Sequence, residues 1–140
     1  MASFWETLQV DNQEMSVYSS VPAGSGPFPT VLIAHPASGV GEFTQSIADR
    51  LAEAGFAGVA MDLFHRVTDD MIADGTAKNA FLDDIEIMSD VNATVDWLIS
   101  YPAIDSDRIG VTGFCMGGRV AWLAAANNSN VKAVAPYYGG

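Results

Sequence analysis

The sequence predicts an α/β fold in which a mostly parallel sheet is flanked by helices. Apolar runs of strand length, such as residues 30–34 and 57–61, alternate with segments that have the periodicity of helices. Near the C-terminal end, a strand pattern, a glycine-flanked cysteine and a helix pattern follow one another directly. Strands separated by helices of this length form parallel βαβ units with right-handed crossovers.

The N-terminal elements are predicted from alternation and from turn residues. Residues 7–10 and 15–18 alternate in polarity and predict a first hairpin, which a loop rich in Pro, Gly and Ser follows at residues 22–29. The run at 30–34 is continuously apolar, as expected for a strand that is buried on both faces.

Helical spacing identifies the next elements. Apolar residues from Phe43 to Ala54 predict a helix that Gly55 closes, and the strand at 57–61 follows it. A longer helix is predicted from Ile85 to Ile99, with acidic residues in its first turn, where the helix dipole favours negative charge. Strands at 109–112 and 131–135 complete the alternation. The carboxyl ends of these parallel strands should meet at one edge, where ligands bind in such folds.

Residues 113–118 read Gly-Phe-Cys-Met-Gly-Gly between the strand at 109–112 and a helix pattern. This order is typical of the nucleophile elbow of α/β-hydrolases, with cysteine in the place of serine. Glycines are needed because side chains at 113 and 117 would collide with neighbouring backbone. Cys115 at a helix N-terminus is therefore predicted to act as a nucleophilic thiolate. The alternative, a small buried apolar residue, leaves the glycine pattern unexplained.

Composition limits the function classes. The length of 140 residues fits one domain, 1–140, and the formal net charge of −11 argues against nucleic acid or an anionic membrane as a partner. The single cysteine excludes an internal disulfide, and the N-terminus lacks a secretory pattern, so a cytoplasmic protein is expected. The acidic residues between Asp69 and Asp90 have no converging spacing, which predicts a solvated surface, no metal and no cofactor.

Four stretches together resemble the dienelactone hydrolase family of α/β-hydrolases. They are residues 62–66 (Asp-Leu-Phe-His-Arg), 90–98, 107–119 and 136–139 (Pro-Tyr-Tyr-Gly). The resemblance implies hydrolysis of a carboxylic ester or lactone through a cysteine thiol ester. The backbone N–H groups of Met116 and Ala37 would then form the oxyanion hole.

The resemblance also implies substrate-binding roles for Arg66 and Tyr137. Arg66 corresponds to an arginine that contacts the substrate carboxylate in this family; the alternative is a surface arginine paired with Asp69 or Asp70. Tyr137 would line the pocket, or else be a core aromatic residue at a strand end.

The sequence departs from the family beside the nucleophile and after it. Pro36 stands where well-known members carry a glutamate that engages the cysteine. His35 in the same loop is either a structural residue or a catalytic one. The triad of this fold runs nucleophile, acid, histidine, yet no residue after Cys115 is Asp, Glu or His.

We therefore expect an incomplete α/β-hydrolase domain without its C-terminal strands, with the acid and the histidine beyond residue 140, and an isolated chain that is inactive and aggregates. The predicted function is cysteine-dependent hydrolysis of a small-molecule ester or lactone, in an oligomeric state that the sequence leaves open. The alternative is a non-catalytic α/β-hydrolase-like domain that binds a ligand or senses redox state through Cys115.

Overall fold

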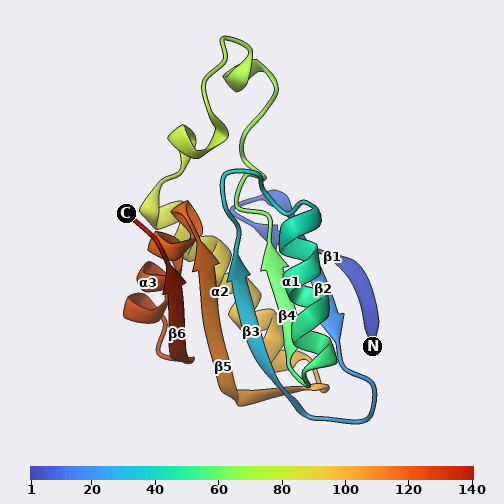
Figure 1. Cartoon of the computed structure of the whole chain (residues 1–140). Coiled ribbons are helices and arrows are strands. Elements are labelled where there is room, and N and C mark those ends of the chain that lie inside the picture. Colours follow the sequence, from blue (N-terminus) through green and yellow to red (C-terminus); the bar gives the residue numbers. More distant parts are fainter.

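In the computed structural model, which describes all residues 1–140, six strands form one sheet in the order β1-β2-β4-β3-β5-β6 (Figure 1). The strands are β1 (Ala2–Val10), β2 (Gln13–Val21), β3 (Phe28–Ala34), β4 (Ala57–Met61), β5 (Ile104–Phe114) and β6 (Val131–Tyr137). Strands β4, β3, β5 and β6 are parallel neighbours, whereas β1 and β2 pair antiparallel and β2 runs antiparallel to β4. The predicted α/β fold with a mostly parallel sheet is confirmed.

The N-terminal hairpin is longer than the sequence pattern indicated. β1 and β2 pair along their whole length, from Ala2 opposite Val21 to Val10 opposite Gln13. The two turn residues, Asp11 and Asn12, both have positive φ, which is the backbone geometry of a tight two-residue hairpin turn. Strand pairing therefore extends beyond the segment that alternates in polarity.

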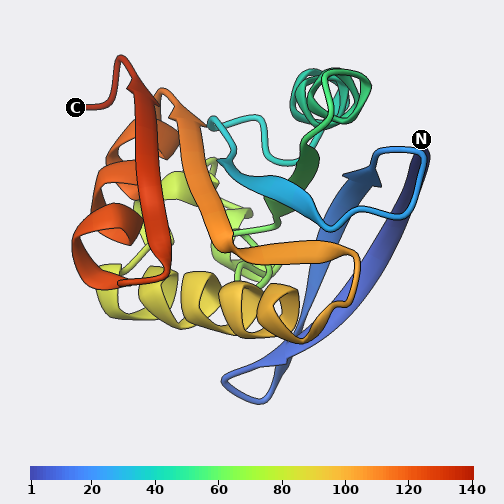
Figure 2. The same ribbon diagram turned by 90° about the horizontal axis from the view of Figure 1, so that it is seen from below.

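Helices cover both faces of the sheet. The helices are α1 (Glu42–Glu53), α2 (Asp84–Ser100) and α3 (Met116–Asn127), with short 3₁₀ turns η1 (Asp70–Ile72) and η2 (Lys78–Phe81). α1 lies on one face, and α2 and α3 lie on the other (Figure 2). The larger apolar core, with residues such as Leu32, Val59 and Val111, includes inward residues of α2 and α3. None of the helices is both long and apolar enough to cross a bilayer.

The acidic first turn of α2 begins as the sequence predicts. The side chain of Asp83 accepts hydrogen bonds from the N–H groups of Ile85 and Glu86, both at 3.1 Å. These bonds satisfy two of the amide groups that a helix N-terminus leaves without intrahelical acceptors.

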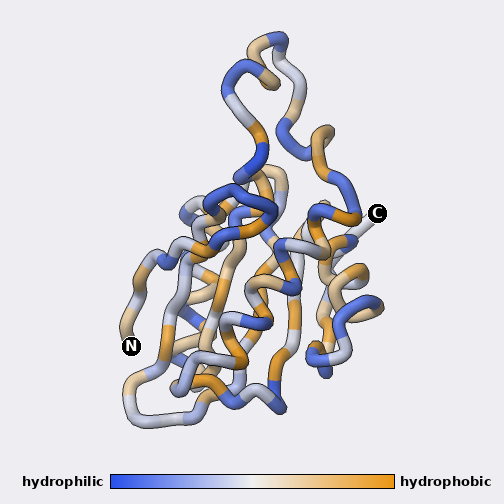
Figure 3. Tube along the Cα trace, turned by 180° about the vertical axis from the view of Figure 1, so that it is seen from behind, coloured by the Kyte–Doolittle hydropathy of each residue, from blue (hydrophilic) through white to orange (hydrophobic).

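The carboxyl ends of the parallel strands lie at one edge of the sheet. Ala34 of β3 pairs with both Met61 of β4 and Gly113 of β5, and Gly113 pairs in turn with Pro136 of β6. The segment between β4 and α2 projects beyond this edge (Figure 1). The hydropathy colouring shows many hydrophilic residues in that segment and apolar ones along the central strands (Figure 3). The edge thus brings together loops from four strands.

Candidate active site

Cys115 occupies the turn between β5 and α3. It is the N-cap of α3 and is exposed, and its backbone has φ 58° and ψ −123°, a conformation that side-chain-bearing residues rarely adopt. A Cβ atom at Gly113 would collide with the carbonyl of Gly117, and one at Gly117 would collide with the carbonyl of Ala34. The reason predicted for the glycines is confirmed, and the alternative of a buried cysteine is wrong.

Aromatic side chains flank the elbow. The ring of Phe114 stacks on Tyr137 at 5.1 Å between centroids and meets Phe43 edge-on at 5.2 Å. The N–H of Cys115 donates to the carbonyl oxygen of Tyr137 at 3.2 Å, which ties the elbow to β6. Tyr137 is not a core residue, because 51% of its surface is exposed. With Phe114 it borders a hollow of about 470 Å³ beside α1.

The two predicted oxyanion donors lie at the ends of adjacent strands. Met116 is the first residue of α3, so its N–H has no acceptor within the helix. Ala37 lies in the loop after β3, and its N–H donates no hydrogen bond within the protein. The elbow touches the end of β3, because a side chain at Gly117 would also crowd the carbonyl of His35. Their donation to a substrate stays a prediction.

His35 is completely buried and has both ring nitrogens occupied. Its Nε2 accepts the N–H of Leu63 at 3.0 Å, so the ring proton is on Nδ1, which lies 2.7 Å from the carbonyl oxygen of Pro36 and donates to it. The ring also packs edge-on against Phe64 at 4.6 Å. Burial lowers the pKa of His35, although the hydrogen bond to Pro36 and the charge of Asp62 oppose this shift. The neutral ring therefore has no nitrogen free to act as a base.

A polar cavity of about 500 Å³ opens beside this loop. It is bordered by residues 37–41, by Asp62, Phe64, His65 and Val67 after β4, and by Lys78 of the projecting segment. The cavity thus lies at the carboxyl ends of β3 and β4, and none of its bordering residues comes from β5 or the elbow.

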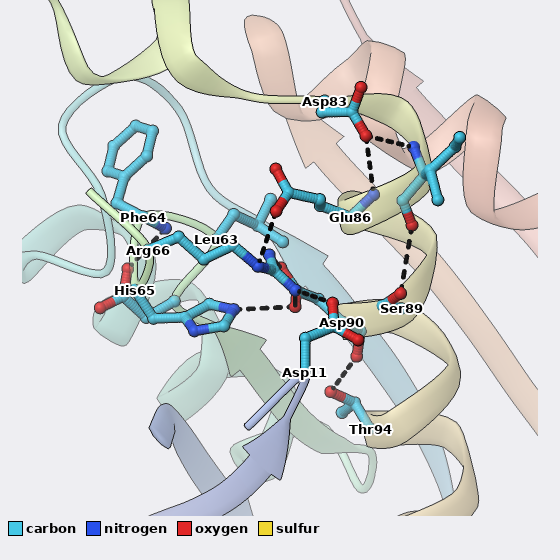
Figure 4. A network of polar contacts seen from close by, with 12 residues as sticks. Asp11, Leu63, Phe64, His65, Arg66, Asp83, Glu86, Ser89, Asp90 and Thr94 are labelled. Carbon is cyan, nitrogen blue, oxygen red and sulfur yellow. Dashed lines mark hydrogen bonds and ion pairs between the residues drawn. The ribbon is translucent and has the colours of Figure 1, made fainter. Parts of the chain in front are cut away.

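Arg66 binds three carboxylates at once (Figure 4). Its guanidinium donates to both oxygens of Asp90, at 3.0 and 2.9 Å, and to Asp11 at 2.6 Å. Its Nε lies 3.2 Å from Glu86. The predicted alternative partners, Asp69 and Asp70, are wrong, because none of these ion pairs involves them. The substrate-binding role of Arg66 stays a prediction.

Asp90 is a buried carboxylate at the centre of this polar network, and the sequence analysis did not single it out. Its side chain is 1% exposed, so the prediction of a solvated acidic surface fails at this position. His65 also contacts it, through Nε2 at 2.8 Å, while the buried Nδ1 of His65 has no partner. The signal was present in the sequence, because position 90 lies on the helical face that contains Ile87, Val91 and Thr94. A polar residue on a buried face needs polar partners.

Comparisons with known proteins agree with this architecture. The family model described as "Dienelactone hydrolase family" matches residues 15–140. A Methylorubrum extorquens protein named "Putative carboxymethylenebutenolidase" is 36% identical over 130 residues, which cover 87% of this chain and 44% of that protein. An Escherichia coli protein with the same name is 34% identical over 137 residues, covering 94% of this chain and 49% of that protein.

The fold has a close match among solved structures. A Klebsiella pneumoniae "Putative Dienelactone Hydrolase" superimposes with a TM-score of 0.86 at 26% identity, over 99% of this chain and 60% of that one. The chain spans about half the length of the curated relatives that it matches.

Replacing Arg66 tests whether its ion pairs stabilise the fold. Arg66→Met leaves Asp90 buried without its cation, so we expect the free energy of unfolding to fall by roughly 3–5 kcal/mol. The matched control is Arg119→Met, because Arg119 pairs with Asp84 at 2.6 Å but both side chains are about half exposed. The control should cost about 0–1 kcal/mol. Equal losses in urea unfolding of the two variants would contradict a structural role for Arg66.

The buried neutral His35 predicts a pH dependence of stability. Because the pKa of His35 is lowered from 6.5 in the folded state, the unfolded chain binds a proton first as the pH falls. The contribution of His35 is thus complete above about pH 6.5 and is lost progressively below it. Urea unfolding between pH 7.5 and 5 should show falling stability, and the slope should be shallower in His35→Gln. An unchanged slope in this variant would assign the effect to other groups.

Proposed function

The chain belongs to the dienelactone hydrolase family, and on this premise we propose that the protein hydrolyses small carboxylic esters or lactones with Cys115 as its nucleophile. The observation that carries the proposal is the exposed cysteine at the N-cap of α3, held at positive φ between glycines that cannot accept a side chain. A packing role gives no reason for this strained and exposed position.

The proposed reaction has two steps. The Cys115 thiolate attacks the carbonyl carbon, the bond to the alkoxy oxygen breaks, and the departing oxygen takes a proton from the protonated base, which leaves a thiol ester. A water molecule then attacks the thiol ester as a base removes its proton, and the carbon–sulfur bond breaks to release the acid and the thiolate. For a lactone, the departing oxygen stays tethered to the acyl group as a hydroxyl, so the second step releases a single hydroxy acid.

In each step a negative charge forms on the carbonyl oxygen. We assign its stabilisation to the N–H groups of Met116 and Ala37, which lack other acceptors and come from the elbow and the adjacent loop. The positive end of the α3 dipole adds to this stabilisation and favours the thiolate before attack. With Pro36 in the place of the family glutamate, the helix terminus becomes the principal source of thiolate stabilisation in this proposal.

The base is proposed to come from residues that this sequence does not contain. Both ring nitrogens of His35 are occupied, and His65 is held by Asp90 with its other nitrogen buried. The acid and the histidine of the triad would then follow Cys115, in the usual order for this fold. Relatives about twice as long as this chain support the idea. Reading the coding sequence past codon 140 tests it, and a stop codon there would contradict it.

A second candidate function is suggested because neither His35 nor His65 is available as a base. An exposed thiol without an available base also fits a domain that binds a ligand or senses oxidants through Cys115. The two functions differ in turnover, because only the hydrolase releases acid and alcohol repeatedly from each cysteine.

Replacement of Cys115 separates these functions. In the full-length protein, Cys115→Ala should reduce kcat for a small ester by roughly three orders of magnitude or more, because the covalent step is lost. The control is Ser129→Ala, an exposed residue in the α3–β6 turn, which should hydrolyse the ester at the unmodified rate. Full activity in Cys115→Ala would overturn the nucleophile assignment. Single turnover in the unmodified protein would favour the second candidate.

A further inference from the structure

The ring of His35 holds one particular peptide group. Its Nδ1–H donates to the carbonyl oxygen of Pro36 at 2.7 Å, and the N–H of Gly39 donates to the same oxygen at 3.0 Å. That carbonyl belongs to the peptide unit that joins Pro36 to Ala37. Because a trans peptide is planar, its C=O and N–H point in opposite directions. Fixing the oxygen of Pro36 therefore fixes the direction of the Ala37 N–H.

A second hydrogen bond anchors the ring itself. Nε2 of His35 accepts the N–H of Leu63, which is the second residue after β4. The ring thus connects the ends of two neighbouring strands, and its edge-on contact with Phe64 fixes its plane. The ring cannot turn without breaking both hydrogen bonds in a buried site, where an unpaired polar group costs roughly 1–3 kcal/mol.

The charge state of the ring allows both of these hydrogen bonds. Only the neutral ring has a donor at Nδ1 and an acceptor at Nε2, and burial, by lowering the pKa of His35, keeps it neutral at physiological pH. Asp62 is the charged group whose field reaches the ring, and it acts in the opposite direction.

From this geometry we propose that His35 is a positioning residue, which orients the Ala37 N–H toward the carbonyl oxygen of the substrate in the transition state. The proposal rests on the proposed function, because it needs Ala37 to be an oxyanion donor. It gives the buried histidine a role beside Cys115 without making it a base. A preorganised donor stabilises the transition state more than the bound substrate, so His35 should act on kcat rather than on KM.

Two amide substitutions separate the two hydrogen bonds of the ring. In His35→Asn the shorter side chain places an N–H donor near the position of Nδ1, so it retains the bond to Pro36 and loses the one to Leu63. In His35→Gln the longer side chain places an acceptor near the position of Nε2, so it retains the bond to Leu63 and loses the one to Pro36. Each variant keeps one polar partner, which makes their stabilities comparable.

The matched control removes a different hydrogen bond to the same loop. The buried hydroxyl of Thr44 donates to the carbonyl of Gly39 at 3.1 Å, and Thr44→Val removes this bond without touching the Pro36–Ala37 peptide. If His35 only stabilises the loop, Thr44→Val and His35→Gln should have similar effects.

The experiment measures kcat and KM for a small neutral ester in the full-length protein, together with inhibition by a trifluoromethyl ketone, which forms an anionic tetrahedral adduct with a thiolate. For His35→Gln we expect kcat to fall about tenfold, KM to stay within about twofold, and inhibition to weaken as kcat does. His35→Asn should retain kcat within about threefold, and Thr44→Val within about twofold. Melting temperatures of all variants separate these effects from loss of folded protein.

Equal values of kcat in His35→Asn and His35→Gln would overturn the proposal, as would a loss in Thr44→Val that equals the loss in His35→Gln. If one amide variant does not fold, the other decides: either full activity in His35→Gln or a tenfold loss in His35→Asn contradicts the proposal. Failure of the proposed function is distinguishable, because it would appear as ester hydrolysis that does not depend on Cys115.

Discussion

The close approach of the first turn of α3 to the end of β3 is the constraint on which the site depends. Gly113 and Gly117 allow backbone atoms of the elbow and of Ala34 to lie where a side chain would not fit. This contact places the first turn of α3 against the end of β3, from which the loop that contains Ala37 continues. Because the same turn holds Cys115 at positive φ, the strain in the backbone and the exposure of the thiol have one origin.

Buried polar groups organise the neighbouring loops. His35 connects the segments after β3 and β4. Asp90 binds Arg66 and His65 and so connects the segment after β4 to α2. Such groups are costly to bury unless their partners are complete, so each one specifies a single arrangement of its loop. One buried nitrogen, Nδ1 of His65, departs from this pattern. The sheet is thus held by apolar packing of its strands and helices, and its carboxyl-end loops by polar contacts.

The family resemblance predicted the position of Arg66 but not its ion-pair partners. Its place after β4 follows from the motif at residues 62–66, and the structure puts it at the expected end of that strand. Its partners could not be predicted, because Asp11 is in the hairpin turn and Glu86 and Asp90 are on α2. The next acidic residues along the chain, Asp69 and Asp70, are on the projecting segment and form none of these pairs. Tertiary folding, rather than sequence distance, decides which charges meet.

The sequence by itself determined the order of elements, the parallel sheet and the elbow. Periodicity and glycine spacing are local properties, and the turn itself requires Gly113, because a side chain there would meet the carbonyl of Gly117. Gly117 is required by the contact with the end of β3, although the motif already indicated it. Only the tertiary structure decided that His35 bridges two strand ends, that Asp90 is buried, and that Tyr137 stacks on Phe114 at the surface. These facts depend on strand register and on the face that a helix turns inward, which bring together residues far apart in the chain.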